Sequence, residues 1–322
     1  MAHHFNLNMY TAFLLIANGN RYSGVEASKS LALSNVAPAH DTISRWLAEE
    51  TSEPNDLWKH VRSFVSLSSS LIVDDTVLDK QWSPKNELVN WHWSGNTHKV
   101  IRGISLVNLL ATQGNDCFPV DYRVNEGVKN AKNKNEYFLE MLDTAKERGF
   151  RPRYVLADSW YSSLENMKHI HALGWKFVIS IKENRLVNET KGVYMAVSTL
   201  DWTKKQVRKV WLKGFGFVLV TRIVFKNGDT RYVCTNGLAL TAYTSLSQES
   251  KQRWTIEEFH RGIKQTTGIE KCYSVKKRSQ LTHIFAAFVA FVRLEWERIK
   301  TGISWYEQKA QRVRLGVAAV FA

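Results

Sequence analysis

Four carboxylates stand out because of the residues that surround them. Asp74 and Asp75 end the apolar run SLIV, and Asp158 ends a second apolar run, YVLA. Glu257 lies in the stretch QRWTIEEFHRGIK, beside a second glutamate and among basic residues. An aspartate after a strand commonly caps a turn, but ligand groups also gather at the carboxyl ends of strands. Because grouped carboxylates need a neutralising cation, and hard oxygen ligands favour Mg²⁺ or Mn²⁺, these residues predict a divalent metal site.

The segment around Glu257 has the periodicity of a helix. At about 100° per residue, Glu257 lies at the edge of the apolar side and Glu258 points toward solvent. The apolar side is expected to pack on a sheet. Taken alone, the segment leaves two roles for Glu257, a metal ligand or the ion-pair partner of Arg253 and Arg261. The apolar side comprises Ile256, Phe259 and Ile263, and the arc that contains Glu257 also holds Arg253, His260, Arg261 and Lys264.

The elements that must position these carboxylates predict an α/β core with a mixed sheet. Three strand-like runs come first, and helices then alternate with strands. Residues 200–235 alternate in polarity and are rich in Val and aromatics, with KNGDT as a hairpin turn. They are expected to form an antiparallel segment inserted before the last helices. The core elements are expected at 70–75, 98–112, 118–124, 134–149, 153–158, 162–174 and 175–182.

The first 66 residues have helical patterns. SGVEASKSLAL and APAHDTISRWLAEE are separated by SNV, in which Ser34 or Asn35 is the candidate cap of the second helix. The spacing leaves two alternatives, a helix-turn-helix or an ordinary helical hairpin. A recognition helix would carry Asp41, Thr42, Ser44 and Arg45.

The charge of the chain indicates which classes of partner it binds. A net charge of +14 and a pI of about 9.6 favour a polyanionic partner, either nucleic acid or an acidic membrane surface. The longest late apolar run, IFAAFVAFV, is too short to span a membrane, and the start of the chain lacks the charged region of a signal peptide. Three widely spaced cysteines indicate buried thiols in a reducing cytoplasm. We therefore expect a cytoplasmic protein that binds nucleic acid and no membrane.

The ordered trio Asp75, Asp158 and Glu257, within DDT, ADSWYSS and RWTIEEFHRGIK, resembles the DDE transposases of bacterial insertion sequences. In that family the aspartate directly before threonine is the ligand, which selects Asp75 over Asp74. The resemblance covers roughly residues 70–290 and includes the strand insertion.

The resemblance is narrower still, to the IS-four superfamily. Its signature Y-x2-R-x3-E-x6-K surrounds the catalytic glutamate. Arg253, Glu257 and Lys264 match these intervals, while Ser250 stands at the tyrosine position.

This resemblance implies an RNase H-like core and two-metal phosphoryl transfer. Two Mg²⁺ or Mn²⁺ ions on Asp75, Asp158 and Glu257 would activate water to cut at the ends of the element, and then the freed 3′-hydroxyl to attack target DNA. The implied partner is double-stranded DNA, both transposon ends and target, bound by a homodimer in a synaptic complex at the nucleoid.

Five basic residues are expected to bind DNA phosphates. Arg253, Arg261 and Lys264 lie beside the glutamate and would neutralise scissile or flanking phosphates. Lys182 and Arg185, in SIKENR, are expected at the same rim, with an ordinary solvated turn as the alternative.

The expected organisation has three parts. Residues 1–66 form a helical DNA-binding region, 67–295 the catalytic domain with its insertion at 200–235, and 296–322 a helical tail. Two other functions stay open: a different RNase H-like nuclease without strand transfer, and a DNA-binding regulator that needs no divalent metal.

Overall fold

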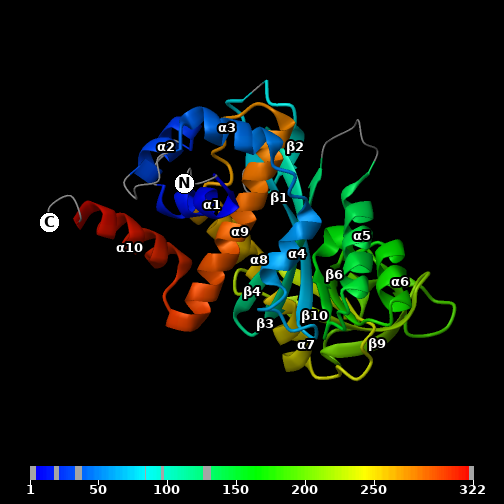
Figure 1. The fold of residues 1–322 in the computed structure, drawn as a ribbon. Coiled ribbons are helices and arrows are strands. Elements are labelled where there is room, and N and C mark those ends of the chain that lie inside the picture. The colour runs from blue at the N-terminus through cyan, green and yellow to red at the C-terminus, as the bar shows by residue number, and fades with distance from the viewer. Residues whose placement is uncertain are drawn as a thin grey trace.

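A long mixed β-sheet runs through the structure, with helices packed against it (Figure 1). This computed structural model describes residues 5–17, 22–32, 38–83, 85–95, 98–125 and 132–318. The cap expected at Ser34 or Asn35 lies outside these residues.

The first half of the sheet consists, in spatial order, of β4 (Asp116–Asn125), β3 (Lys99–Gln113), β1 (Ser70–Asp79), β5 (Val155–Ala157) and β6 (Phe177–Ile181). β1, β3 and β4 are antiparallel neighbours, whereas β5 and β6 run parallel to β1. This order and these directions are those of an RNase H-like core, so the predicted fold class is confirmed. A further strand, β2 (Asn90–Ser94), pairs with the start of β3.

The second half of the sheet contains the antiparallel segment that the sequence predicts. Outward from β6 it consists of β11 (Thr230–Thr235), β10 (Gly216–Val224) and β9 (Val207–Leu212), all within the predicted 200–235. Two short strands before those bounds follow, β7 (Leu186–Asn188) and β8 (Met195–Ala196). The expected KNGDT turn closes the β10–β11 hairpin, where Gly228 has a φ of 87° that favours glycine. Because β11 pairs with β6, the insertion extends the core sheet.

The expected end of the first strand is wrong. The apolar run SLIV predicts a strand that ends at the two aspartates, but β1 continues to Asp79. Its later residues pair with β3, so that Asp79 lies opposite Gly103. Asp74 and Asp75 are therefore in mid-strand, where successive side chains point to opposite faces of the sheet.

Helices form where the apolar periodicity predicts them. α5 (Lys134–Glu147) begins with a capping box between Asn133 and Glu136 and buries the apolar residues expected to face the core. α6 (Leu164–Ala172) packs beside it. The later helices are α7 (Tyr243–Gln252), α8 (Thr255–Thr267), α9 (Lys277–Thr301) and α10 (Trp305–Ala318), and the short 3-10 turns are η1 (Pro54–Asp56), η3 (Ser159–Tyr161) and η4 (Val197–Thr199).

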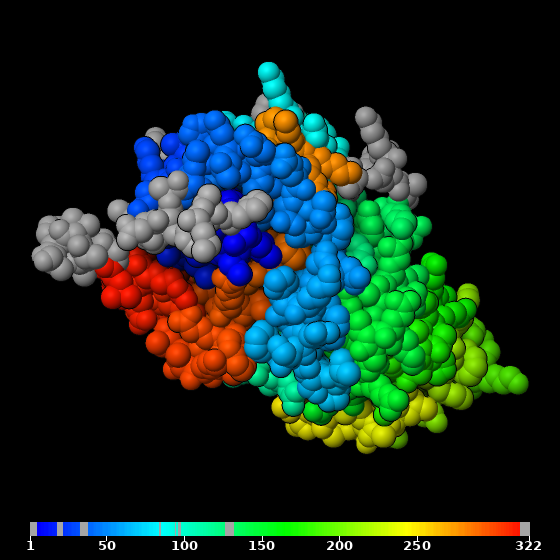
Figure 2. Space-filling model, viewed as in Figure 1, coloured from blue at the N-terminus to red at the C-terminus, as the bar shows by residue number. Residues whose placement is uncertain are grey.

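The N-terminal helices are joined to the C-terminal ones by packing. They are α1 (Leu7–Ile16), α2 (Gly24–Ala32), α3 (His40–Glu49) and α4 (Leu57–Val61), and α1, α3 and α4 contact α9. Tyr10 and His283 form a buried hydrogen bond of 2.8 Å between Oη and Nδ1. Figure 2 shows the blue N-terminal helices against the orange α9 and the red α10. The boundary expected at 295/296 falls inside α9.

The candidate recognition helix is α3. Its buried side holds Ile43 and Leu47, whereas Asp41, Thr42, Ser44 and Arg45 are exposed. Among the residues that the structure describes, no helix has both the length and the apolar character needed to cross a bilayer.

Candidate active site

Successive side chains of β1 point to opposite faces of the sheet, so its two aspartates contact different residues. Asp74 lies opposite Asn108 of β3, and the side chain of Asn108 is 2.9 Å from Nε2 of His260 on α8. Asp74 therefore faces the α8 side of the sheet. Asp75 faces the α5 side, where the ammonium of Lys134 lies 2.6 Å from its Oδ2 and Tyr161 donates a 3.2 Å hydrogen bond to its Oδ1.

Asp158 comes beside Asp74 through the register of two parallel strands. Ile72 of β1 pairs with Leu156 of β5, and each aspartate follows two residues later. Neighbouring strands lie about 4.8 Å apart. Asp158 also caps η3, since its Oδ1 accepts a 2.7 Å hydrogen bond from the backbone N–H of Trp160.

Glu257 reaches the same place from the first turn of α8. Ile256, Phe259 and Ile263 are buried, as the helical arc predicts. The Glu257 side chain is 35% exposed and lines the hollow that also holds the aspartates, whereas Glu258 is exposed and lines a separate hollow. The predicted difference in exposure between the two glutamates is confirmed.

One cavity of about 1360 Å³ is thus lined by Asp74, Asp75, Asp158 and Glu257. Burial raises the pKa of the Asp74 carboxyl well above its usual range, and repulsion from Asp158 raises it further. Asp75 and Glu257 act in the same direction, and Arg253 opposes them. A carboxyl under this repulsion gains strongly from a nearby cation.

Residues 66–293 match a family model described as "Transposase DDE domain". The chain belongs to this family. Over 153 residues it is 26% identical to "Probable transposase for insertion sequence element IS5377" of Geobacillus stearothermophilus, a match that covers 44% of this chain and 38% of that protein. The solved structure of the "Drosophila P element transposase strand transfer complex" aligns with 15% identity and a TM-score of 0.29, covering 53% of this chain and 37% of that one. The chain spans well under half the length of both proteins.

The donor set of this DDE domain fits a hard divalent cation, and DDE domains use one. Asp74, Glu257 and His260 offer ligand atoms within 4.8 Å of one another. Asp75 lies outside this group because its carboxylate is turned to Lys134. Asp75, which the family motif selects, and Asp74, which the geometry favours, are therefore both candidate ligands.

His260 is a candidate ligand that the sequence reasoning did not select. Burial lowers its pKa to about 3, so the ring is neutral, and a metal ion on its Nε2 would displace the side-chain amide of Asn108 that lies 2.9 Å away. The spacing Glu-x-x-His, which puts two ligands on one side of a helix, is the sequence signal that marks it.

The basic residues of α8 and its N-terminus differ in whether their charged groups are free to bind a phosphate. Arg253 is buried, with its Nη1 3.6 Å from Asp74 Oδ2 and 3.5 Å from Glu257 Oε1. Lys264 donates a 2.7 Å hydrogen bond to the carbonyl of Val77. Arg261 is exposed at the cavity wall and is the one of the three best placed to meet a phosphate.

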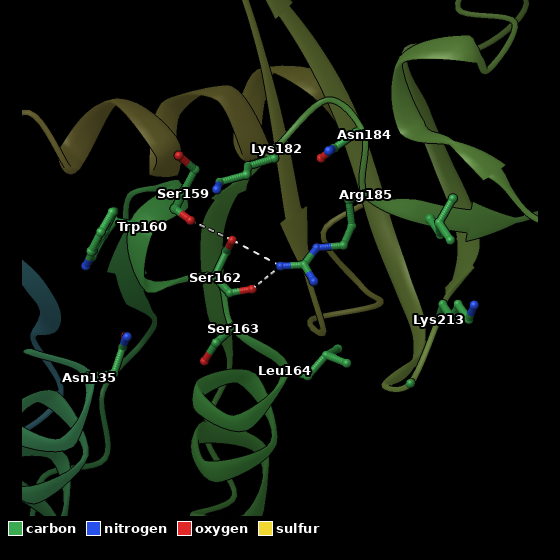
Figure 3. A pocket seen from close by; sticks show the side chains of 12 residues that line it. Asn135, Ser159, Trp160, Ser162, Ser163, Leu164, Lys182, Asn184, Arg185 and Lys213 are labelled. Atoms are coloured by element: carbon green, nitrogen blue, oxygen red, sulfur yellow. Dashed lines mark hydrogen bonds between the residues drawn. The ribbon is translucent and has the colours of Figure 1, made fainter. Parts of the chain in front are cut away.

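Lys182 and Arg185 do not line the acidic cavity. They line a neighbouring pocket of about 710 Å³, shown in Figure 3. The side chain of Arg185 donates to the carbonyl oxygen of Ser162 and, at 3.3 Å, to its hydroxyl. The two hollows share Trp160, so the predicted rim is divided: Arg261 and Lys264 line the cavity of the carboxylates, and Lys182 and Arg185 line a pocket of their own.

Proposed function

We propose that this protein is a DNA transposase that cuts the ends of an insertion sequence and joins them to target DNA. The observation that carries the proposal is the convergence of four carboxylates in one cavity of an RNase H-like core. Membership of the DDE family supports the same reaction, and the net charge of +14 supports DNA as the partner.

In this proposal Asp75, Asp158 and Glu257 hold two Mg²⁺ or Mn²⁺ ions, with Asp74 and His260 as further ligands. When bound, the ions make water and then a 3′-hydroxyl nucleophilic and stabilise the charge on the phosphate. Arg253 holds the carboxylates of Asp74 and Glu257 in place through its ion pairs with both.

The other basic residues act on the DNA. Arg261 and Lys264 neutralise phosphates next to the scissile one, and Lys182 and Arg185 belong to the path of the same strand. The DNA is double-stranded, as transposon ends and as target.

The remaining parts of the chain have roles in assembly and recognition. Residues 1–66 recognise the ends through the exposed side of α3, 67–295 carry the chemistry, and 296–322 form a helical tail. Two copies bring two ends together at the nucleoid in the cytoplasm.

The pair Glu257→Gln and Glu258→Gln tests the chemistry. The substrate is a plasmid that carries the gene with its chromosomal flanks, and end cleavage and joining to a second plasmid are measured with Mg²⁺. Glu257→Gln removes the charge that a divalent ion requires, so cleavage should fall by several orders of magnitude with little change in melting temperature. Glu258→Gln, on an exposed side of the same turn, should stay within a few-fold of wild type.

Two results would count against the proposal. Wild-type cleavage by Glu257→Gln would leave that residue only an ion-pair role. Cleavage without joining would favour a nuclease over a transposase.

A further inference from the structure

The pocket beside the acidic cavity is basic, and none of the described residues that line it carries a carboxylate. Lys182, Arg185 and Asn184 come from the turn between β6 and β7, and Lys213 from the turn between β9 and β10 (Figure 3). The opposite wall is the segment from η3 to the start of α6, which presents Ser159 and Ser163. Ammonium, amide and hydroxyl groups are all donors to an anion.

The three described cations of the pocket differ in what holds them. Arg185 is held by Ser162, and its backbone N–H closes the turn on the carbonyl of Lys182 at 3.0 Å. Lys182 and Lys213 have no carboxylate beside them among the described residues that line the pocket. Lys213 is placed by the Tyr194 ring, whose centroid is 5.5 Å from its Nζ. Arg185 therefore shapes the wall of the pocket, and the ammonium groups of Lys182 and Lys213 are the cations placed to meet an anion.

The two hollows are separated by three consecutive residues. Asp158 lines the acidic cavity, Ser159 lines the basic pocket, and Trp160 lines both. The Trp160 residue is 62% exposed, so an indole face stands between them. Grooves that carry a nucleic-acid strand combine basic groups for the backbone with such aromatic faces. The acidic cavity would hold metal ions that meet one phosphate, and the basic pocket would hold the next one. This arrangement suits a DNA strand that runs across both hollows.

We propose that the pocket formed by Lys182, Lys213, Asn184, Ser159 and Ser163 binds a backbone phosphate of the DNA strand whose scissile phosphate lies in the acidic cavity. This rests on the proposed function. It gives the strand insertion a direct part in DNA binding, because Lys213 lies between two of its strands.

Lysine acetylation read by mass spectrometry tests the location on the full chain. The protein is labelled alone, with a mixed-sequence duplex that has a single-stranded overhang, and with inorganic phosphate at the same phosphate concentration. DNA should reduce the labelling of Lys182 and Lys213 several-fold and leave Lys300 unchanged, an exposed lysine of α9 whose Nζ lies 4.5 Å from the centroid of the Trp296 ring. Inorganic phosphate alone should protect neither.

Salt dependence of DNA affinity tests the charge. The double substitution Lys182→Ala/Lys213→Ala should lower the slope of log K against log salt by about 0.9, the value for one phosphate contact. Lys300→Ala should keep the wild-type slope, and so should Lys213→Arg, which retains the positive charge.

The outcomes separate this pocket from the catalytic proposal. Protection of Lys264 in the acidic cavity without protection of Lys182 and Lys213 would overturn the pocket and leave the proposed function intact. Equal protection by inorganic phosphate would make it a site for a free anion and overturn the DNA assignment. A wild-type protein that does not cleave DNA with Mg²⁺ would overturn the proposed function itself.

Discussion

A metal ion that binds Asp75 must displace the ammonium of Lys134 from its carboxylate. It lies 2.6 Å from Asp75 Oδ2, with side-chain exposures of 23% and 18% for the two partners. At an effective dielectric constant of about 20, unit charges this close attract by about 6 kcal/mol. Desolvation and side-chain entropy offset most of that attraction, which leaves a net contribution of about 1–3 kcal/mol.

Lys134→Ala should therefore weaken the metal-free protein and strengthen metal binding. Without the ammonium, Asp75 has no partner in its ion pair, so the free energy of unfolding should fall by about 1–3 kcal/mol. A divalent ion then binds without displacing a cation, and 1–3 kcal/mol corresponds to about 5- to 150-fold higher Mg²⁺ affinity. Saturating Mg²⁺ should largely restore the melting temperature, since ligand binding stabilises the folded state.

The assay is a Mg²⁺ titration followed by melting temperature and by calorimetry. Lys132→Ala is the matched control, because Lys132 makes an exposed ion pair of 2.6 Å with Glu140 just before the same helix. It should change neither quantity measurably. If Lys134→Ala binds Mg²⁺ with wild-type affinity, Asp75 is not a ligand, and the metal belongs to the group of Asp74, Glu257 and His260.

Three further substitutions follow from the structure. Gly262→Ala would put a Cβ 2.7 Å from Trp305 Cε3, so overpacking should cost about 1–3 kcal/mol in a denaturant titration while Mg²⁺ affinity is retained. Asp158→Asn should abolish Mg²⁺-dependent cleavage and keep DNA affinity in a gel-shift assay; normal nicking by this variant would exclude Asp158 from the site. Arg45→Ala should reduce the preference for end DNA over random DNA with unchanged melting temperature, and an unaltered preference would take α3 out of recognition.

The packing of the N-terminal helices makes a single exposed side chain such as Arg45 a cleaner probe of recognition than a deletion. Removing residues 1–66 would uncover buried side chains of α9, because α1 and α3 lie against that helix. A deleted protein would lose stability together with recognition. Substituting an exposed side chain changes recognition without changing stability.

Local periodicity was sufficient for much of the fold. α5, α6 and α8 form where apolar residues recur at helical spacing, and the β10–β11 hairpin turns at its Asn-Gly pair, Asn227 and Gly228. The contrast between Glu257 and Glu258 is also local, since one turn of helix sets both directions. These features depend on neighbours within a few residues, which the sequence displays directly.

Only the tertiary structure decided which charges meet. Asp74 and Asp75 are adjacent in sequence, yet pairing of β1 with β3 turns one toward α8 and the other toward Lys134. The same long-range packing buries Arg253 between two carboxylates and moves Lys182 into a pocket of its own. Residue types and spacing determine that carboxylates and cations are available, but contacts between distant segments depend on strand pairing and helix packing, which no local pattern specifies.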